Sequence, residues 1–246
     1  MLRPFWGRFI AFDGRFGLLL VLAFGIPRFA IVLNANITGN YSPLSLVFLL
    51  MWAAPFIFLT AAGRRSVGLA APRRPLWLVA ALPAGALACL LFFLFARWQN
   101  GDSEYNWLVY IARTYPDAAT AGAEGTSLRF FLIYAAVAMT FSPVGEELLY
   151  RGIVHDSFAA SMGEYRASMA ESLAFGVTHL AHFGILYRQG AWEFAFFPAL
   201  HWMAMMFLVS RLFYGFRRLS GSLAGAVIGH AGFNLMMMYL VFYRIY

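Results

Sequence analysis

Two adjacent glutamates and an arginine lie inside an apolar part of the sequence, in the segment Gly145-Glu146-Glu147-Leu148-Leu149-Tyr150-Arg151-Gly152. A charge at the centre of a bilayer costs about 3 kcal/mol or more, so it is retained where it has a partner or a task. On a helix, Glu147 and Arg151 stand four residues apart with the acid first, and this spacing predicts an ion pair. Glu146 lies about 100° around the helix from Glu147 and has no such neighbour in the segment. We therefore predict a structural role for Glu147 and a carboxylate free for acid–base chemistry at Glu146.

Two later apolar stretches carry the other polar groups that could take part in such chemistry. His230 and Asn234 are four residues apart and share a helix face. Both can donate hydrogen bonds, and two donors aimed at one point could stabilise the oxyanion of a hydrolytic reaction. His179, together with Glu146, could hold and deprotonate a water molecule. His182 follows three residues after His179, and we expect it either to support this group or to pack against it.

The same residue types raise the question of a metal ion. Three histidines and one glutamate offer nitrogen and oxygen ligands that suit Zn²⁺, namely His179, His182, His230 and Glu146. The zinc-protease signature His-Glu-x-x-His is absent, however, and a metal would take His230 away from the oxyanion. The single cysteine, Cys89, lies in an apolar run and offers no thiolate cluster. We expect no cofactor, with a zinc site as the less favoured alternative.

The composition indicates a membrane protein. Of the 246 residues, 62% are hydrophobic and 12% are charged, whereas a soluble domain carries about 25% charged residues. The mean hydropathy is +0.69. All 18 basic residues are arginines, and the net charge is +7. We attribute the excess to arginines that flank membrane spans on the cytoplasmic side, and we expect no nucleic-acid partner because no basic stripe with interleaved aromatic residues is present.

Seven hydrophobic stretches predict an all-α, polytopic transmembrane helical bundle of about seven spans. They cover residues 17–33, 43–62, 76–96, 128–161, 167–187, 193–213 and 222–243. The fourth stretch is longer than one span, and Pro143 and Gly145 predict a kink or break around residues 142–145. Irregular backbone at membrane depth is tolerated beside protein or a watery cavity, so we expect the acids to face an internal polar cavity.

We interpret residues 1–246 as a single integral-membrane domain. Residues 1–127 hold the less diagnostic N-terminal spans, the first of which is interrupted by Pro27 and Arg28. Residues 128–243 form the motif-bearing core that would carry the chemistry.

Arginines mark the orientation of the chain in the membrane. Four of them, at positions 64, 65, 73 and 74, follow the second span, and two more, at positions 217 and 218, follow the sixth. Positively charged loops stay in the cytoplasm, so both loops and the N-terminus are predicted to be cytoplasmic. The localisation that follows is the inner (cytoplasmic) membrane, with several passes.

Three motifs, in this order, resemble those of one known family. They are Glu146-Glu147-x-x-x-Arg151, Phe175-x-x-x-His179 and His230-x-x-x-Asn234, on three hydrophobic segments. This trio is similar to that of the CAAX prenyl protease and bacteriocin-processing family of glutamate-type intramembrane endopeptidases, also called the abortive-infection family. The resemblance covers about residues 128–240. It implies a multi-helix membrane fold with a cavity, and hydrolysis of a peptide bond near the end of a membrane-associated substrate.

The likeness also implies a role for each residue and leaves the substrate open. Glu146 would activate water with His179, Glu147 would pair with Arg151, and the two residues of the last motif would stabilise the oxyanion. The partner would be a membrane-anchored peptide or protein in the lipid bilayer. A prenylated CAAX terminus, a bacteriocin leader and a C-terminal sorting anchor all remain compatible.

A second hypothesis comes from another class of protein. A non-catalytic membrane protein or a transporter could use the same residues as a proton relay or a peptide-binding cavity, since intramembrane acids and histidines also serve pumps. The sequence shows no symmetry between two halves of the kind found in many transporters, which argues against this alternative.

Overall fold

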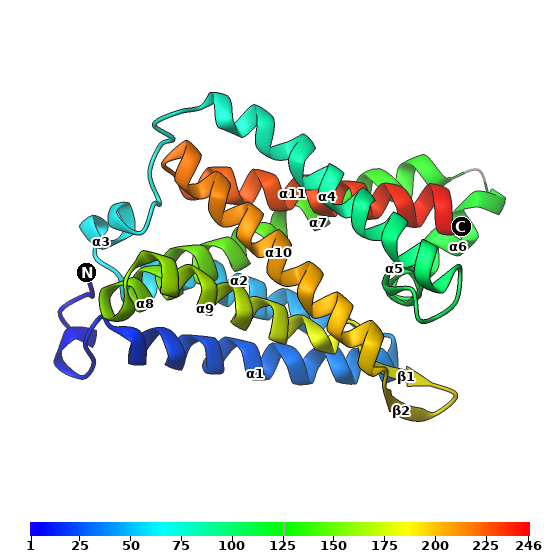
Figure 1. Ribbon diagram of the computed structural model, residues 1–246, viewed down its shortest axis with the longest axis horizontal. Helices are drawn as coiled ribbons and strands as arrows, with labels where there is room; N and C mark the ends of the chain where they lie inside the picture. The colour runs from blue at the N-terminus through cyan, green and yellow to red at the C-terminus, as the bar shows by residue number, and fades with distance from the viewer. Residues whose placement is uncertain (125) are drawn as a thin grey trace.

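The protein is a bundle of helices with one short β-hairpin (Figure 1). The computed structural model describes residues 1–124 and 126–246. The helices that build the bundle are α1 (Gly14–Thr38), α2 (Ser42–Phe58), α4 (Leu76–Asn100), α7 (Ser127–Glu146), α8 (His155–Met162), α9 (Glu164–Thr178), α10 (Phe196–Ser220) and α11 (Leu223–Leu240). The elements at its ends are α3 (Ala61–Ser66), α5 (Trp107–Ala112), α6 (Pro116–Glu124), and the strands β1 (Ile185–Arg188) and β2 (Ala191–Phe194).

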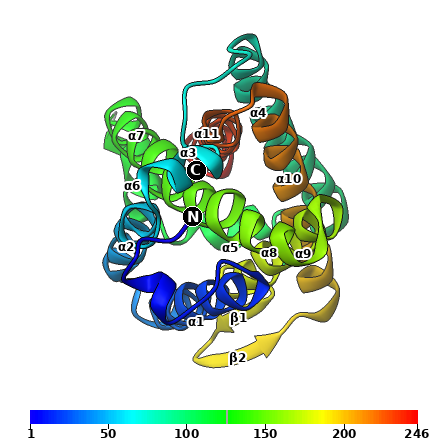
Figure 2. The ribbon, with the colours of Figure 1, turned by 90° about the vertical axis from the view of Figure 1, so that its left-hand side faces the viewer.

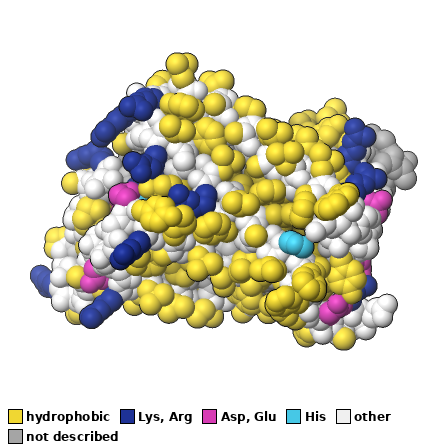
Figure 3. Space-filling view, in the orientation of Figure 1, with side chains coloured by type: hydrophobic (Ala, Val, Ile, Leu, Met, Phe, Trp, Pro, Cys, Tyr) yellow, Lys and Arg dark blue, Asp and Glu magenta, His cyan; other side chains and the backbone are white. Residues whose placement is uncertain are grey.

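The length and surface of these helices confirm the predicted membrane bundle. The helical segments long and apolar enough to cross a membrane are Gly14–Thr38, Leu76–Asn100, Ser127–Met162, Phe196–Ser220 and Leu223–Ile245, and α2 is a shorter apolar helix. Hydrophobic side chains such as Val79, Leu91 and Leu208 are more than half exposed, and apolar atoms cover most of the middle of the face shown in Figure 3. Such a large apolar surface fits lipid contact. When the shorter helices α2 and α9 are included, the described chain crosses from one end of the bundle to the other in each of the predicted hydrophobic stretches.

The irregularity predicted for the fourth span lies one turn later than expected. The helix α7 runs through Pro143 to Glu146 without a break at residues 142–145, and the backbone continues as a π-helix over Glu147–Val154 before α8 begins. Such π-helical turns are rare and are frequently found at functional sites. All eight residues of this π-helix are buried. The distortion therefore lies at the predicted charged motif, inside the protein.

The fifth predicted stretch, residues 167–187, is helical only in its first part. The helix α9 ends at Thr178, a 3₁₀ turn follows, and β1 pairs antiparallel with β2. Gln189 and Gly190 form the two-residue turn, with positive φ angles of 50° and 80° that match the type I′ hairpin geometry. Nε of Arg188 lies 2.6 Å from Glu104, so the hairpin is tied to the loop that follows α4.

Helix α11 lies inside the bundle, against α4, α7 and α10 (Figure 2). It approaches α4 very closely, because a Cβ atom added to Gly85 would lie 1.8 Å from the Gly229 carbonyl oxygen. Small residues allow such close packing in membranes, where burial in lipid does not by itself drive helices together. Since α11 carries the predicted hydrogen-bond donors, this contact fixes their position.

The substitution Gly85→Ala tests that contact. The added methyl group would collide with the Gly229 carbonyl, so we expect a lower melting temperature in detergent micelles. Gly215→Ala is the matched control, because a Cβ there meets no atom within 4 Å and alanine favours a helix over glycine by about 1 kcal/mol. A Gly85→Ala protein that melts at the wild-type temperature would contradict the close packing of α4 and α11.

Candidate active site

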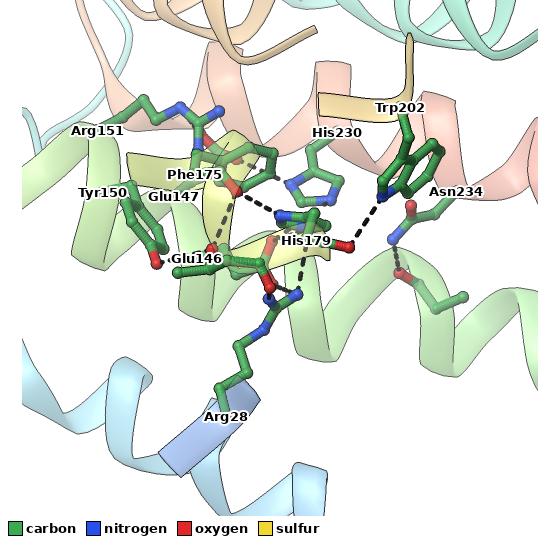
Figure 4. A network of polar contacts seen from close by, with 12 residues as sticks. Arg28, Glu146, Glu147, Tyr150, Arg151, Phe175, His179, Trp202, His230 and Asn234 are labelled. Carbon is green, nitrogen blue, oxygen red and sulfur yellow. Dashed lines mark hydrogen bonds and ion pairs between the residues drawn. The ribbon is translucent and has the colours of Figure 1, made fainter. Parts of the chain in front are cut away.

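Glu146 is the last residue of α7 and lies deep in the bundle (Figure 4). Its side chain is 0% exposed. One carboxylate oxygen, Oε1, lies 2.8 Å from Nη2 of Arg28, which projects from the middle of α1. The expectation of an unpaired Glu146 is therefore wrong. Its partner, Arg28, comes from the first predicted span. Spacing along one helix could not identify this pair, because the two residues lie on different helices.

Arg28 connects this carboxylate to the chain that follows α9. Its Nη2 also lies 3.1 Å from Nε2 of His179, and its Nη1 donates to the Thr178 carbonyl at 3.2 Å. The side chain is only 2% exposed. A buried charge is costly unless it is paired and hydrogen-bonded. The guanidinium thus meets a carboxylate, an imidazole and a carbonyl with its planar set of donors.

Two histidines converge on the same carboxylate. Oε2 of Glu146 lies 3.9 Å from Nε2 of His179 and 4.0 Å from Nε2 of His230. His179 begins the 3₁₀ turn after α9, and His230 lies in α11. Gaps of this length are too long for direct hydrogen bonds and match an arrangement bridged by one water oxygen. The structure thus brings together three predicted site residues that lie far apart in the sequence.

Backbone contacts fix the ring of His179. Its Nδ1 lies 2.7 Å from the carbonyl oxygen of Phe175, one helical turn earlier. A carbonyl can only accept, so Nδ1 carries the proton and Nε2 of the neutral ring is an acceptor. The indole N–H of Trp202 donates to the His179 carbonyl at 2.9 Å. The unprotonated nitrogen therefore faces Arg28 and Glu146.

Glu147 contacts both Arg151 and His230. Its Oε2 lies 3.2 Å from Nε of Arg151, as the i, i+4 spacing predicts, and its Oε1 lies 2.8 Å from Nδ1 of His230. The arginine is fully buried; Glu171 lies 3.7 Å from its Nε, and the ring centre of Phe175 lies 4.2 Å from its guanidinium carbon. Glu147 therefore balances a buried cation and also orients the second histidine.

Two buried charges of this network were missing from the sequence prediction: Arg28 and Glu171. Both lie inside predicted spans, where an ionisable residue needs a partner, and this was the available signal. Their partners, Glu146 and Arg151, lie on other helical segments. Spacing within one segment could therefore not identify them.

Asn234 and His182 lie at the margin of the group. The side-chain N–H₂ of Asn234 donates one hydrogen bond to the Ala138 carbonyl at 2.8 Å, which leaves its second hydrogen for another acceptor. The ring of His182 is half-buried, with its centre 5.7 Å from that of His179. Asn234 thus lies one turn from His230, and one of its two side-chain hydrogens is bonded to α7.

A cavity of about 400 Å³ opens onto these residues. Its polar groups include Arg28, His179, His182, His230 and Asn234, and most of its other walls are aromatic and aliphatic. Glu146 is fully buried beside the two imidazoles. An apolar pocket with a few convergent polar groups is the usual form of a binding site.

The site residues do not form a metal-binding cluster. Among the side chains that the structure describes, residues 1–120 and 126–246, no three His, Cys, Asp or Glu are placed to hold one ion. Nη2 of Arg28 lies 2.8 Å from Glu146 and 3.1 Å from His179. A permanently charged guanidinium therefore stands where a metal shared by these two residues would bind. The donor set fits this cation better than Zn²⁺.

Comparison with known proteins assigns part of the chain to a family. Residues 128–236 match the protein family described as type II CAAX prenyl endopeptidase Rce1-like. This segment includes Glu146, Glu147, His179 and His230. Neither the curated proteins nor the solved structures gave a match.

The substitution Glu147→Ala should strongly destabilise the protein. It removes the closest partner of Arg151, and breaking a buried pair in this way costs about 3–5 kcal/mol. The free energy of unfolding can be measured by titration with a denaturing detergent. Asp102→Ala is the control, because its pair with Arg97 is exposed and spans 3.5 Å, and such pairs contribute about 1 kcal/mol or less. Equal stabilities of the two variants would contradict the buried network.

Proposed function

We propose that this chain, which matches the Rce1-like family of type II CAAX prenyl endopeptidases over residues 128–236, hydrolyses a peptide bond with a water molecule activated by Glu146 and His179. The family match and the apolar helices support a multi-pass membrane peptidase. The observation that carries the mechanism is the convergence of two imidazole nitrogens, 3.9 and 4.0 Å away, on one carboxylate oxygen.

Glu146 acts as the general base in this proposal. A water oxygen between Oε2 of Glu146 and Nε2 of His179 would be within hydrogen-bond reach of both. Both atoms are acceptors. Oε2 of Glu146 takes one hydrogen of the water, and Nε2 of His179 takes the other in place of its 3.1 Å contact with Nη2 of Arg28, so the lone pairs of the water are aimed into the cavity. The water oxygen attacks the carbonyl carbon of the scissile bond, and its proton passes to Glu146.

His230 and Asn234 stabilise the resulting oxyanion. Oε1 of Glu147 accepts a hydrogen bond from Nδ1 of His230, and in this proposal Nε2 of the same ring carries the hydrogen that is donated to the oxyanion. Asn234 contributes the N–H that is not used by Ala138. Preorganised donors of this kind act where negative charge develops in the transition state.

The reaction closes by return of the proton. Glu146 donates the proton it took from water to the leaving nitrogen, and the carbon–nitrogen bond breaks. The products are a carboxylic acid and an amine, and the site regains its starting charge. Arg28 holds Glu146 and His179 in register throughout, and no metal takes part in any step.

The substrate is a membrane-associated peptide or protein, cut near its C-terminus or leader. The largely aromatic and aliphatic walls of the cavity suit an apolar segment. A prenylated CAAX terminus, a bacteriocin leader and a sorting anchor all satisfy this requirement. The proposed location is the inner membrane, with the N-terminus in the cytoplasm.

Substitution of the three converging residues tests the mechanism. Glu146→Gln, His179→Ala and His230→Ala should each reduce kcat by about 10²–10⁴-fold, the usual contribution of an acid–base group. The assay uses purified protein in liposomes, an internally quenched peptide with an S-farnesyl cysteine near its C-terminus, and excess chelator. Folding is checked by the melting temperature.

Two results would contradict the mechanism. Glu146→Gln could cleave at the wild-type rate, which would exclude this carboxylate as the base. Alternatively, the wild-type protein could drive pH-dependent solute uptake into the liposomes without any shortened product, which would favour a transporter.

Arg28 is tested by comparing Arg28→Lys with Arg28→Ala. A lysine keeps the charge beside Glu146 but cannot present a planar set of donors to His179 and Thr178 as well. We expect Arg28→Lys to retain most of the stability and to lose about 10²-fold in kcat, as misplaced catalytic groups do. Arg28→Ala should lose stability too, while the exposed control Arg97→Ala should match the wild type. Unchanged kcat in Arg28→Lys and Arg28→Ala would exclude a role in the site.

A further inference from the structure

The charged side chains are divided unequally between the two ends of the bundle (Figure 3). One end consists of the N-terminal segment, the loop after α2, the start of α9 and the end of α10. It carries Arg3, Arg8, Arg15, Arg64, Arg65, Arg73, Arg74, Arg166, Arg217 and Arg218, against Asp13, Asp156 and Glu164. At the other end, Arg97, Arg113, Arg129, Arg188 and Arg244 face Asp102, Glu104, Asp117 and Glu193, an excess of only one arginine. The arginine-rich end is therefore the cytoplasmic one.

The cavity extends from the catalytic residues toward the other end. Its lining includes Tyr41 at the start of α2, Thr114 and Tyr115 after α5, and Tyr134 in the first half of α7. Within the described chain, no lining residue comes from the segments that form the arginine-rich end. Access from the cytoplasm would therefore have to cross the packed part of the bundle.

Helices α2 and α7 seal the cavity at their crossing. The indole N–H of Trp52 donates to the Phe141 carbonyl at 2.8 Å. Beside it, a Cβ added to Gly145 would lie 3.0 Å from the Phe48 carbonyl and 2.9 Å from the Trp52 ring. This contact leaves no room for a peptide between the two helices on the cytoplasmic side of the crossing.

The same two helices carry the opening. Among the described residues that line the cavity, the exposed ones are Ser42 and Ser45 on α2 and Val137 on α7. We call these three residues the mouth. Ser45 lies about two turns before Trp52, and Val137 lies one turn before Phe141, both toward the end with few net charges. The side chains of the mouth and of nearby Thr114 and Tyr134 carry hydroxyl groups or are apolar, and none is charged.

We propose that the substrate enters through the mouth from the non-cytoplasmic side. It is an uncharged, extended segment of an exported or outward-facing peptide whose anchor stays in the bilayer. The hydroxyl groups of Ser42 and Ser45 offer hydrogen bonds to its backbone, and the three side chains of the mouth carry no charge, so a charged segment would lose hydration there without gaining a partner. The inference rests on the proposed peptidase function for its substrate. The side of access is independent of it.

Single cysteines test the side of access, since the chain has one cysteine, the buried Cys89. In a Cys89→Ala background, Ser45→Cys reports on the mouth, Ser103→Cys on the same end outside the cavity, and Ser66→Cys on the arginine-rich end. All three serines are exposed. Sealed right-side-out and inside-out vesicles are treated with a membrane-impermeant maleimide. We expect Ser45→Cys and Ser103→Cys to react in right-side-out vesicles and Ser66→Cys only in inside-out ones.

Cleavage by the labelled proteins is then measured in detergent with the farnesylated quenched peptide. The label should abolish cleavage by Ser45→Cys relative to the same unlabelled variant and leave cleavage by Ser103→Cys unchanged. Reaction of Ser45→Cys only in inside-out vesicles, or in neither, overturns the proposal, as does full cleavage after labelling. If no variant cleaves, the proposed function fails, while the labelling pattern still decides the side of access.

Discussion

The buried ion pair between Arg28 and Glu146 is the interaction on which the site depends. It joins the first helix to the fourth hydrophobic stretch, and both side chains are almost completely removed from solvent. Neither charge is stable there without the other, because desolvation of a lone ion costs several kcal/mol. The pair fixes α1 against α7, and the same guanidinium reaches His179. The arginine that compensates the buried charge of Glu146 therefore also positions this carboxylate, the proposed base, beside His179.

The second glutamate, Glu147, takes part in a second network of the same kind. Consecutive residues of a helix point in directions about 100° apart, so the two carboxylates of the motif face different partners. Glu146 meets Arg28 and His179, while Glu147 meets Arg151 and His230. Each carboxylate thus serves one arginine and one histidine, and the imidazole nitrogens meet at Oε2 of Glu146. The π-helix begins at Glu147, where the side chains of the motif have to point toward these different partners.

Much of the fold and part of the site could be predicted from the sequence. Hydrophobic runs gave the all-α bundle, and the i, i+4 spacing gave the pair of Glu147 and Arg151. The pairing of Arg28 with Glu146 could not be predicted in this way, because it joins residues from different spans and depends on which helices are neighbours. The same limit applies to Glu171 and to the contact between Glu147 and His230. The β-hairpin was not predicted, because its strands lie within or beside apolar runs and its turn, Gln189-Gly190, is only two residues long.

Arg28 and Glu146 act as one buried unit in this site. A double-mutant cycle on the free energy of unfolding, with Arg28→Ala, Glu146→Ala and the double variant in detergent micelles, measures this coupling directly. We expect the double variant to lose less than the sum of the single losses, with an interaction energy of about 1–3 kcal/mol. Single losses that sum to the loss of the double variant within about 0.5 kcal/mol would show that the two residues are independent and would contradict the proposed coupling.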